Sequence, residues 1–126
     1  MALSININYR IKRNAEQEDQ MRYLVNELKV FKSLSSLLVV SAIIGYNNGI
    51  NYPFEKSAEP VLMQFFTDDN YDIMNLLGYA FEKNQSIFKK MDGNKPNNKQ
   101  FEIFEKYANA GFPILVEKLG IKFGTV

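Results

Sequence analysis

The sequence contains no cysteine and no histidine. Without cysteine, the chain can form no disulfide, no thiolate nucleophile and no zinc–thiolate site. Without histidine, it lacks the commonest general base and the commonest metal ligand, so catalytic triads that depend on histidine are excluded. Tryptophan is also absent, which leaves phenylalanine, leucine and isoleucine to build the core. We therefore expect a protein that is not an enzyme and that binds no metal and no cofactor.

Long hydrophobic runs and an excess of one charge are missing as well. The most apolar stretch, residues 36–46, is much shorter than the roughly 20 residues that span a bilayer. The first residues, MALSININYRIKRN, contain no apolar run behind a basic start, which a secretion signal would have. The formal net charge of +1 favours no particular class of partner. We expect a cytoplasmic protein without membrane contact.

A large apolar content makes a packed core possible. Hydrophobic residues make up 46% of the 126 residues, and we expect a single domain over residues 1–126. The stretch LSSLLVVSAIIGY is apolar nearly all round and predicts a buried helix over 34–46, capped by Ser33 or Ser35. Gly45 in its last turn predicts a close backbone contact. The predicted fold class is mainly α, a compact helical bundle around this central helix, with an N-terminal strand and room for one or two further short strands.

Periodicity places the other elements. Alternating apolar and polar residues predict a strand over 3–11, and residues 61–66 are read as a short strand or an extended run. Residues 100–119 are read as one helix, broken at Asn109 and Gly111 and restarted by Pro113. Two amphipathic helices are expected, one after a cap at Asn14 and one after a cap at Asp68 or Asp69. Their predicted buried stripes are Met21, Leu24, Val25 and Leu28 in the first, and Ile73, Leu76, Leu77, Ala80 and Phe81 in the second.

The order strand, helix, turn, helix over residues 3–46 is that of a ribbon-helix-helix protein. In that arrangement two chains pair their strands as a homodimer, and the polar strand face enters the major groove of DNA. The alternative is an ordinary strand that closes onto the tail IKFGTV. If the strand reads DNA, the side chains that would contact bases and phosphates are Asn6, Asn8, Arg10, Lys12 and Arg13.

The remaining polar clusters have structural explanations. Asp68, Asp69 and Asp72 could hold a cation through oxygen ligands, but acidic residues are also favoured at a helix N-terminus, which is the interpretation we prefer. Glu102 and Glu105 are expected on a solvated helix face. The stretch GYNNG is interpreted as the end of the central helix, followed by a loop that connects two helices of the core. Aromatic residues that could form a protein interaction surface are Tyr46, Tyr52, Phe54 and Phe123.

Three segments, VFKSLSSLLVVSAIIGYNNG, PFEKSAEPVLMQFF and IFEKYANAGFPILVEKL, resemble the DNA phosphorothioation-associated protein 4 (Dnd system-associated protein 4) family. The resemblance covers residues 10–119, and Ala110 stands where that family has glycine. The shared features fall on Phe31, Gly45, Gly49, Pro53, Glu59, Tyr107, Ala108, Asn109 and Gly111.

This resemblance implies a small non-enzymatic subunit beside the machinery of bacterial loci that put sulfur into the DNA backbone and defend against phage. It supplies no catalytic residue. The partners expected are DNA, other subunits of a modification or restriction complex, and a second copy of the chain. The alternative hypothesis is a protein–protein interaction adaptor or homodimeric scaffold without direct DNA contact.

Overall fold

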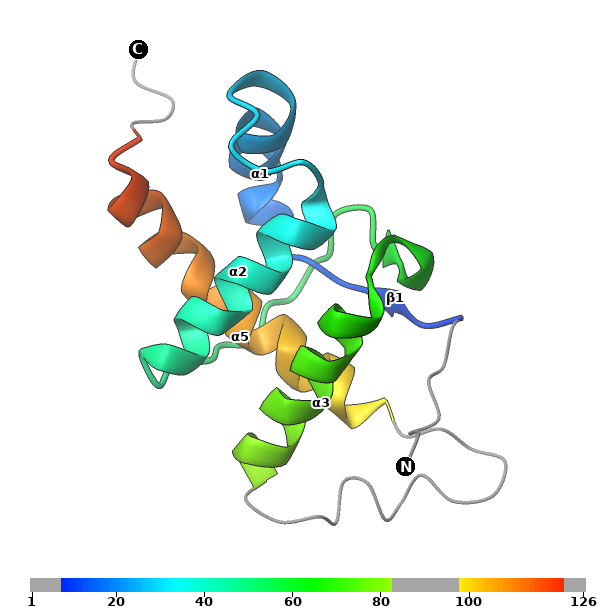
Figure 1. Ribbon diagram of the computed structural model, residues 1–126. Helices are drawn as coiled ribbons and strands as arrows, with labels where there is room; N and C mark the ends of the chain where they lie inside the picture. Colours follow the sequence, from blue (N-terminus) through cyan, green and yellow to red (C-terminus); the bar gives the residue numbers. More distant parts are fainter. Residues whose placement is uncertain (1–7, 83–97, 122–126) are drawn as a thin grey trace.

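The computed structural model describes residues 8–82 and 98–121, and it is predominantly helical, as predicted (Figure 1). In chain order the elements are β1 (Arg10–Ile11), the 3₁₀ turn η1 (Ala15–Gln17), α1 (Glu18–Arg22), the π-helical turn η2 (Tyr23–Glu27), α2 (Leu34–Asn47), β2 (Val61–Leu62), the 3₁₀ turn η3 (Met63–Phe65), α3 (Asp68–Glu82) and α5 (Lys99–Leu119). Helices α2 and α5 cross at the centre, α3 packs beside them, and α1 lies over one end.

Helix α2 is the central buried helix, which confirms the prediction over 34–46. Ser33 is its N-cap, because its side chain accepts a hydrogen bond from the backbone N–H of Ser36. A Cβ on Gly45 would overlap the carbonyl oxygen of Tyr107 in α5. The predicted close backbone contact at Gly45 is therefore confirmed, and the neighbour is α5.

Helix α5 is continuous from Lys99 to Leu119, so the predicted break at Asn109 and Gly111 is wrong. Gly111 is needed for packing, since a Cβ there would overlap the carbonyl oxygen of Ser41 in α2. Pro113 has no N–H to donate to the carbonyl of Asn109. That carbonyl accepts a hydrogen bond from the side-chain amide of Gln17 instead, at 3.1 Å. The helix passes through proline because another element supplies the missing donor.

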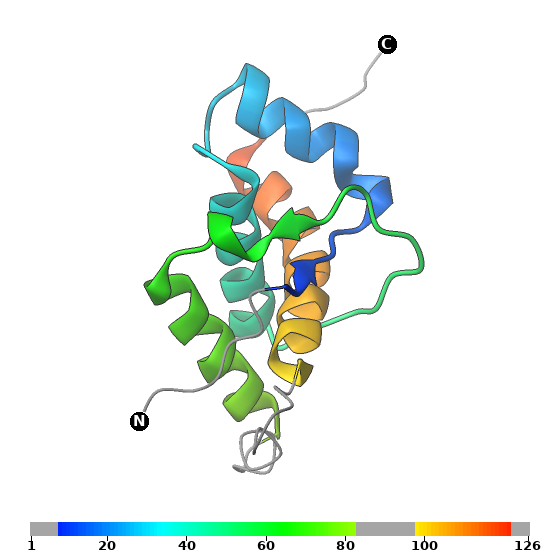
Figure 2. The same cartoon turned by 90° about the vertical axis from the view of Figure 1, so that its right-hand side faces the viewer.

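The N-terminal strand pairs inside the chain. Arg10 lies opposite Leu62 and Ile11 opposite Val61, in an antiparallel two-stranded sheet beside α5 (Figure 2). Residues 3–7 of the predicted strand, and 122–126 of the tail given as its alternative partner, lie outside the described residues. The described part of the strand therefore pairs with the segment that follows α2.

The helical segment after Asn14 is less regular than expected. The side chain of Asn14 accepts a hydrogen bond from the N–H of Glu16, so the predicted cap is present. The turns then change from 3₁₀ through α to π, and the segment ends near Lys29, which has a positive φ of 55°. Met21 and Leu24 are buried, but Leu28 is exposed. The π turn rotates the last predicted stripe residue away from the core.

Helix α3 is present, with two corrections. Its first turn is closed by Thr67, not by Asp68 or Asp69: the N–H of Asn70 donates to the Thr67 hydroxyl, and the N–H of Thr67 donates to the Asn70 side chain. The predicted buried stripe is also partly wrong, because Leu76 is 67% exposed and Phe81 41% exposed. The large side chains of α3 that are buried in the core are those of Met74 and Leu77.

Within the described residues, no helix combines the length and the apolar character needed to cross a bilayer.

Candidate functional site

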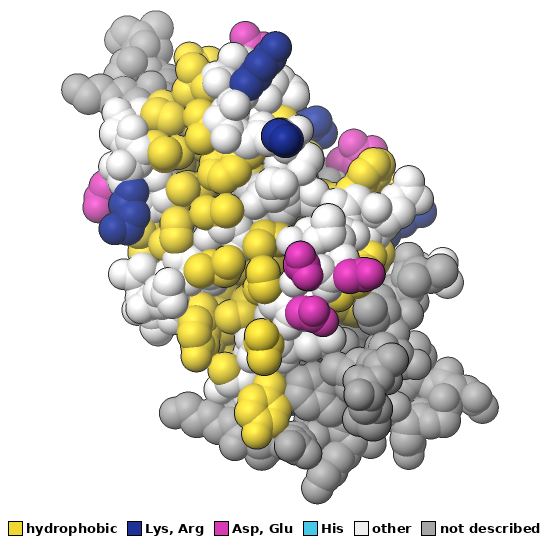
Figure 3. Space-filling view, in the orientation of Figure 1, with side chains coloured by type: hydrophobic (Ala, Val, Ile, Leu, Met, Phe, Trp, Pro, Cys, Tyr) yellow, Lys and Arg dark blue, Asp and Glu magenta, His cyan; other side chains and the backbone are white. Residues whose placement is uncertain are grey.

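An exposed apolar face covers the sides of α2 and α3, and we call it the α2–α3 face. It exists because α3 turns a different side toward the core than the sequence predicted, which leaves large apolar side chains exposed (Figure 3). A shallow hollow of about 330 Å³ lies within it. The exposed large residues of the face are Ile43, Tyr46, Leu76, Tyr79 and Phe81, and the hollow is lined by Tyr46, Ile73, Leu76, Leu77, Tyr79 and Ala80.

Aromatic contacts with α5 hold this face in place. The ring of Tyr107 meets the ring of Tyr46 edge-on, with centroids 5.7 Å apart, and that of Phe81 at 6.3 Å. Burial, and then the neighbouring Tyr46, raise the pKa of the Tyr107 hydroxyl. Edge-to-face pairs of this kind restrain the ring orientations. The face therefore offers a preformed aromatic and aliphatic surface with phenol hydroxyls, suited to apolar side chains of a partner.

The predicted aromatic interaction residues do not all belong to this face. Tyr46 lies on it. Tyr52 is exposed in the segment after α2, where its N–H donates to the carbonyl of Lys106 at 3.2 Å. Phe54 is half-buried and lines a separate shallow hollow beside Asn14, and Phe123 lies outside the described residues.

The predicted DNA-contacting residues differ in their exposure to solvent. Asn8, Arg10 and Lys12 are exposed, and Asn6 lies outside the described residues. The ammonium group of Lys12 lies 4.9 Å from the centre of the Tyr9 ring. The described residues thus place a short polar and basic stretch beside the two-stranded sheet.

Arg13 differs from the other basic residues, because it is only 1% exposed. Its Nη1 donates to the Glu18 carboxylate and its Nε to the carbonyl of Glu59, at 3.0 Å. Glu18 also accepts from Arg22, and the hydrogen bond from Arg13 is the main reason why the pKa of Glu18 lies below its usual value. Arg13 faces the interior and does not belong to the exposed stretch that holds Arg10 and Lys12, which corrects its place in the predicted set.

A buried carboxylate was missed by the sequence analysis, which expected Glu105 on a solvated face. Glu105 is only 7% exposed and accepts hydrogen bonds from the Tyr9 hydroxyl at 2.9 Å and the Lys12 N–H at 2.8 Å. Burial raises the pKa of Glu105, and these two hydrogen bonds oppose the rise. Burial and the neighbouring Glu105 raise the pKa of Tyr9. A sequence signal existed, since Glu105 lies one turn from both Phe101 and Ala108, inside the apolar stripe of α5.

Asn109 joins three parts of the chain, a role that its position in the motif did not reveal. Its side-chain oxygen accepts hydrogen bonds from Asn14 at 2.8 Å and Gln17 at 3.1 Å. Its side-chain nitrogen donates to the carbonyl of Tyr52 at 2.8 Å. The motif YANAG therefore combines a polar connector, Asn109, with a close helix contact, Gly111.

The acidic cluster at the start of α3 is exposed. Among residues 8–82 and 98–121, no three acidic, histidine or cysteine side chains are grouped closely enough to hold a metal ion. The arrangement of Asp68 and Asp69 in the first turn of α3 fits the favourable interaction of carboxylates with the positive end of a helix.

Comparison with known proteins gives one family. Residues 10–124 match the family described as DNA sulphur modification system-associated protein 4. No curated protein and no solved structure matches the chain.

Proposed function

Since the chain belongs to the DNA sulphur modification system-associated protein 4 family, we propose that it is a non-enzymatic accessory subunit that binds another protein of such a system through the α2–α3 face. The observation that carries this proposal is the exposure of large apolar residues on that face, above all Leu76. The lack of histidine and cysteine supports a role in binding rather than in proton transfer or nucleophilic catalysis.

The composition of the face supports a protein partner. Tyrosine and phenylalanine are enriched in protein–protein interfaces, while charged side chains are depleted from their centres. The hollow in the α2–α3 face is lined by apolar and tyrosine side chains. A partner of matching chemistry would present an apolar ridge, such as one side of an amphipathic helix, to this hollow. The family name associates the chain with a DNA sulphur modification system, so we expect the partner among its other components.

The test is co-purification of the tagged protein with the other components of the system, after nuclease treatment. We expect Leu76→Lys to abolish the association, because it places a charge at the centre of the face. The matched control is Leu119→Lys, which makes the same change at an exposed leucine at the end of α5. Both variants should keep the wild-type melting temperature.

Two results would contradict the proposal. One is an association that survives Leu76→Lys, and the other is equal loss in both variants. Light scattering gives a further check. If Leu76→Lys converts a dimer of the isolated protein into a monomer, the face is the contact between two copies of the chain, and the proposed heterologous partner is wrong.

Direct DNA contact is a second candidate function, favoured by the exposure of Arg10 and Lys12 beside Asn8. Such binding should weaken steeply as salt concentration rises, because phosphate contacts release counterions. We expect Arg10→Ala and Lys12→Ala to weaken it and to reduce the salt dependence, with Lys118→Ala at the far end of α5 as the control. Binding that is undetectable, or that does not change with salt, would exclude this role.

A further inference from the structure

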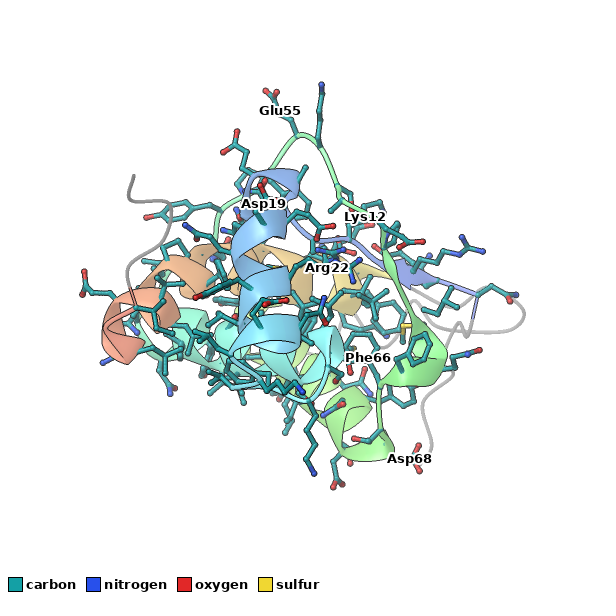
Figure 4. The ribbon with its side chains drawn as sticks, turned by 90° about the horizontal axis from the view of Figure 1, so that it is seen from above. Lys12, Asp19, Arg22, Glu55, Phe66 and Asp68 are labelled. Atoms are coloured by element: carbon teal, nitrogen blue, oxygen red, sulfur yellow. The ribbon has the colours of Figure 1, made fainter. Side chains whose placement is uncertain are left out.

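A cleft lies where α1, the N-terminus of α2 and the strand β2 meet. Its volume is about 350 Å³. Figure 4 shows Arg22 extending from α1 toward the side of the molecule where Phe66 lies. The lining residues that matter for binding are Arg13, Arg22, Ser33, Leu34, Ser35 and Glu59.

The wall of this cleft contains a buried guanidinium with an unused donor. The side chain of Arg13 is fully buried, and its Nε and Nη1 are bonded to Glu59 and Glu18. Its Nη2 is buried and has no hydrogen-bond partner among the described residues. A buried charged donor without an acceptor is costly, so an acceptor from outside the chain, either water or an anion, would stabilise this group.

The N-terminus of α2 adds backbone donors to the same cleft. In a helix the first N–H groups have no partner within the helix, and they carry a partial positive charge. Ser33 caps the N–H of Ser36, and the hydroxyls of Ser33 and Ser35 lie 2.8 Å apart. The first turn of this 14-residue helix, including Leu34 and Ser35, lines the cleft. Helix N-termini of this kind bind anions.

Two glutamates lie near these donors and must be taken into account. Glu18 is shared by Arg13 and Arg22, so its charge is already compensated. Glu59 lies 3.8 Å from Arg22, but its side chain is 83% exposed and belongs to a weak surface pair. When the Glu59 side chain turns into solvent, the Nη2 group of Arg22 loses this partner, and the two guanidinium groups then exceed the Glu18 carboxylate by one positive charge.

We propose that this cleft is a binding site for a phosphate-like oxyanion, held by Nη2 of Arg13, by Arg22 and by the first-turn N–H groups of α2. Tetrahedral oxyanions match this set, because several oxygen acceptors can meet donors that converge from a guanidinium and a helix end. The site is separate from the α2–α3 face, so it does not depend on the proposed protein contact. The phosphate could be free or part of a nucleic-acid backbone.

Titration with inorganic phosphate, followed by ¹H–¹⁵N NMR at constant ionic strength, tests the site. We expect saturable shifts of the Arg13 side-chain N–H signals and of the backbone N–H signals of Leu34 and Ser35. Arg22→Gln should weaken phosphate binding about tenfold, the usual effect of losing one charge-assisted hydrogen bond. Lys118→Gln removes the same charge from the far end of α5 and should leave binding unchanged.

A second variant acts on the helix end. Leu34→Pro removes one backbone N–H at the first position of α2, where proline is tolerated, and the extended Ser33 (ψ 163°) suits the residue before proline. It should also weaken phosphate binding, measured as a smaller phosphate-dependent rise in its own melting temperature. This comparison stays valid if the substitution of the partly buried Leu34 lowers the melting temperature itself.

Duplex DNA distinguishes the two sources of phosphate. Competition between a short duplex and inorganic phosphate for the same N–H signals identifies a nucleic-acid backbone as a ligand, and phosphate binding without competition identifies a free anion. The proposal is overturned if phosphate shifts no signal of Arg13 or Leu34 beyond the effect of chloride. It is also overturned if Arg22→Gln binds phosphate as tightly as the wild type, because the anion then lies elsewhere.

Discussion

At the scale of single residues, Gly45 and Gly111 set how closely α2 and α5 approach. We expect Gly111→Ala to destabilise the protein by about 2 kcal/mol or more, since the added Cβ would overlap the Ser41 carbonyl and force the helices apart. Gly120→Ala is the control: its φ of 68° is unfavourable for alanine, but no atom lies within 4 Å of the added Cβ. Urea denaturation measures both, and an equal cost for the two would show that packing at the crossing is unimportant.

The raised pKa of Glu105 should make the free energy of unfolding depend on pH. Its pKa in the folded protein is above its usual value, so the folded state holds a proton at pH values where the unfolded chain has lost it. The wild type should therefore lose stability, relative to Glu105→Gln, as pH rises through the interval between the usual and the raised pKa. The difference grows by about 1.4 kcal/mol for each unit by which the pKa is raised.

The experiment compares free energies of unfolding for the wild type and Glu105→Gln at several pH values from mildly acidic to neutral. The comparison cancels the opposite contribution of Glu18, whose lowered pKa makes both proteins lose stability in acid. A constant difference across this range would show that Glu105 titrates normally.

Helix caps and close backbone contacts could be predicted from single residues, but contacts between distant parts of the chain could not. The cap at Ser33 and the close contact at Gly45 follow from side-chain size and hydrogen-bonding capacity at known helix positions. Thr67 was missed because two aspartates follow it and are equally good caps. Arg13 and Glu105 were placed on the surface because charged residues usually lie there. Glu105 is bonded to Lys12, 93 positions away, and Arg13 is bonded to Glu59, 46 positions away. Local sequence patterns do not predict contacts at such separations.

At the scale of elements, the path of α5 through Pro113 depends on Gln17. We expect Gln17→Ala to cost about 1–2 kcal/mol in the wild type, because the Asn109 carbonyl loses the donor that replaces the missing helical N–H. In a Pro113→Ala background the new N–H can bond that carbonyl, so Gln17→Ala should cost less. A double-mutant cycle with chemical denaturation measures the coupling, and additive effects would contradict it.

Helix existence was predictable, whereas helix orientation was not. The apolar stretch over 34–46 identified α2, and the pattern after Asp68 identified α3. The buried side of α3 is set by packing against α5, and it includes Met74 rather than Leu76. The α2–α3 face therefore escaped prediction, although Tyr46 was identified.

At the scale of the whole molecule, the crossing of α2 and α5 is the structural centre. Amide hydrogen exchange should be slowest in these two helices, where Leu38 and Phe104 are fully buried. Among the described residues, exchange should be fast at Glu55 and Lys56, which are exposed and lie in a segment with little regular structure. Exchange measured by NMR or mass spectrometry checks this order, and uniform protection would contradict it.

The class of the fold could be predicted because a chain with this apolar content and helical periodicity has few alternatives. The pairing of β1 with β2 could not, because two residues per strand give no distinctive pattern. The ribbon-helix-helix hypothesis was based on the order of the predicted elements, which does not specify the partner of a strand. The cleft beside Arg13 forms only where α1, α2 and β2 meet, so no single sequence motif predicts it.

The side chains of Tyr9, Asn14 and Gln17 donate hydrogen bonds to α5, at Glu105 and Asn109. The acceptors of these three residues thus lie 92 to 96 positions later in the chain. During translation, residues 9–17 cannot take their final place until residues 105–109 have left the ribosome. A nascent chain arrested before residue 99 should therefore remain susceptible to proteases near its N-terminal end.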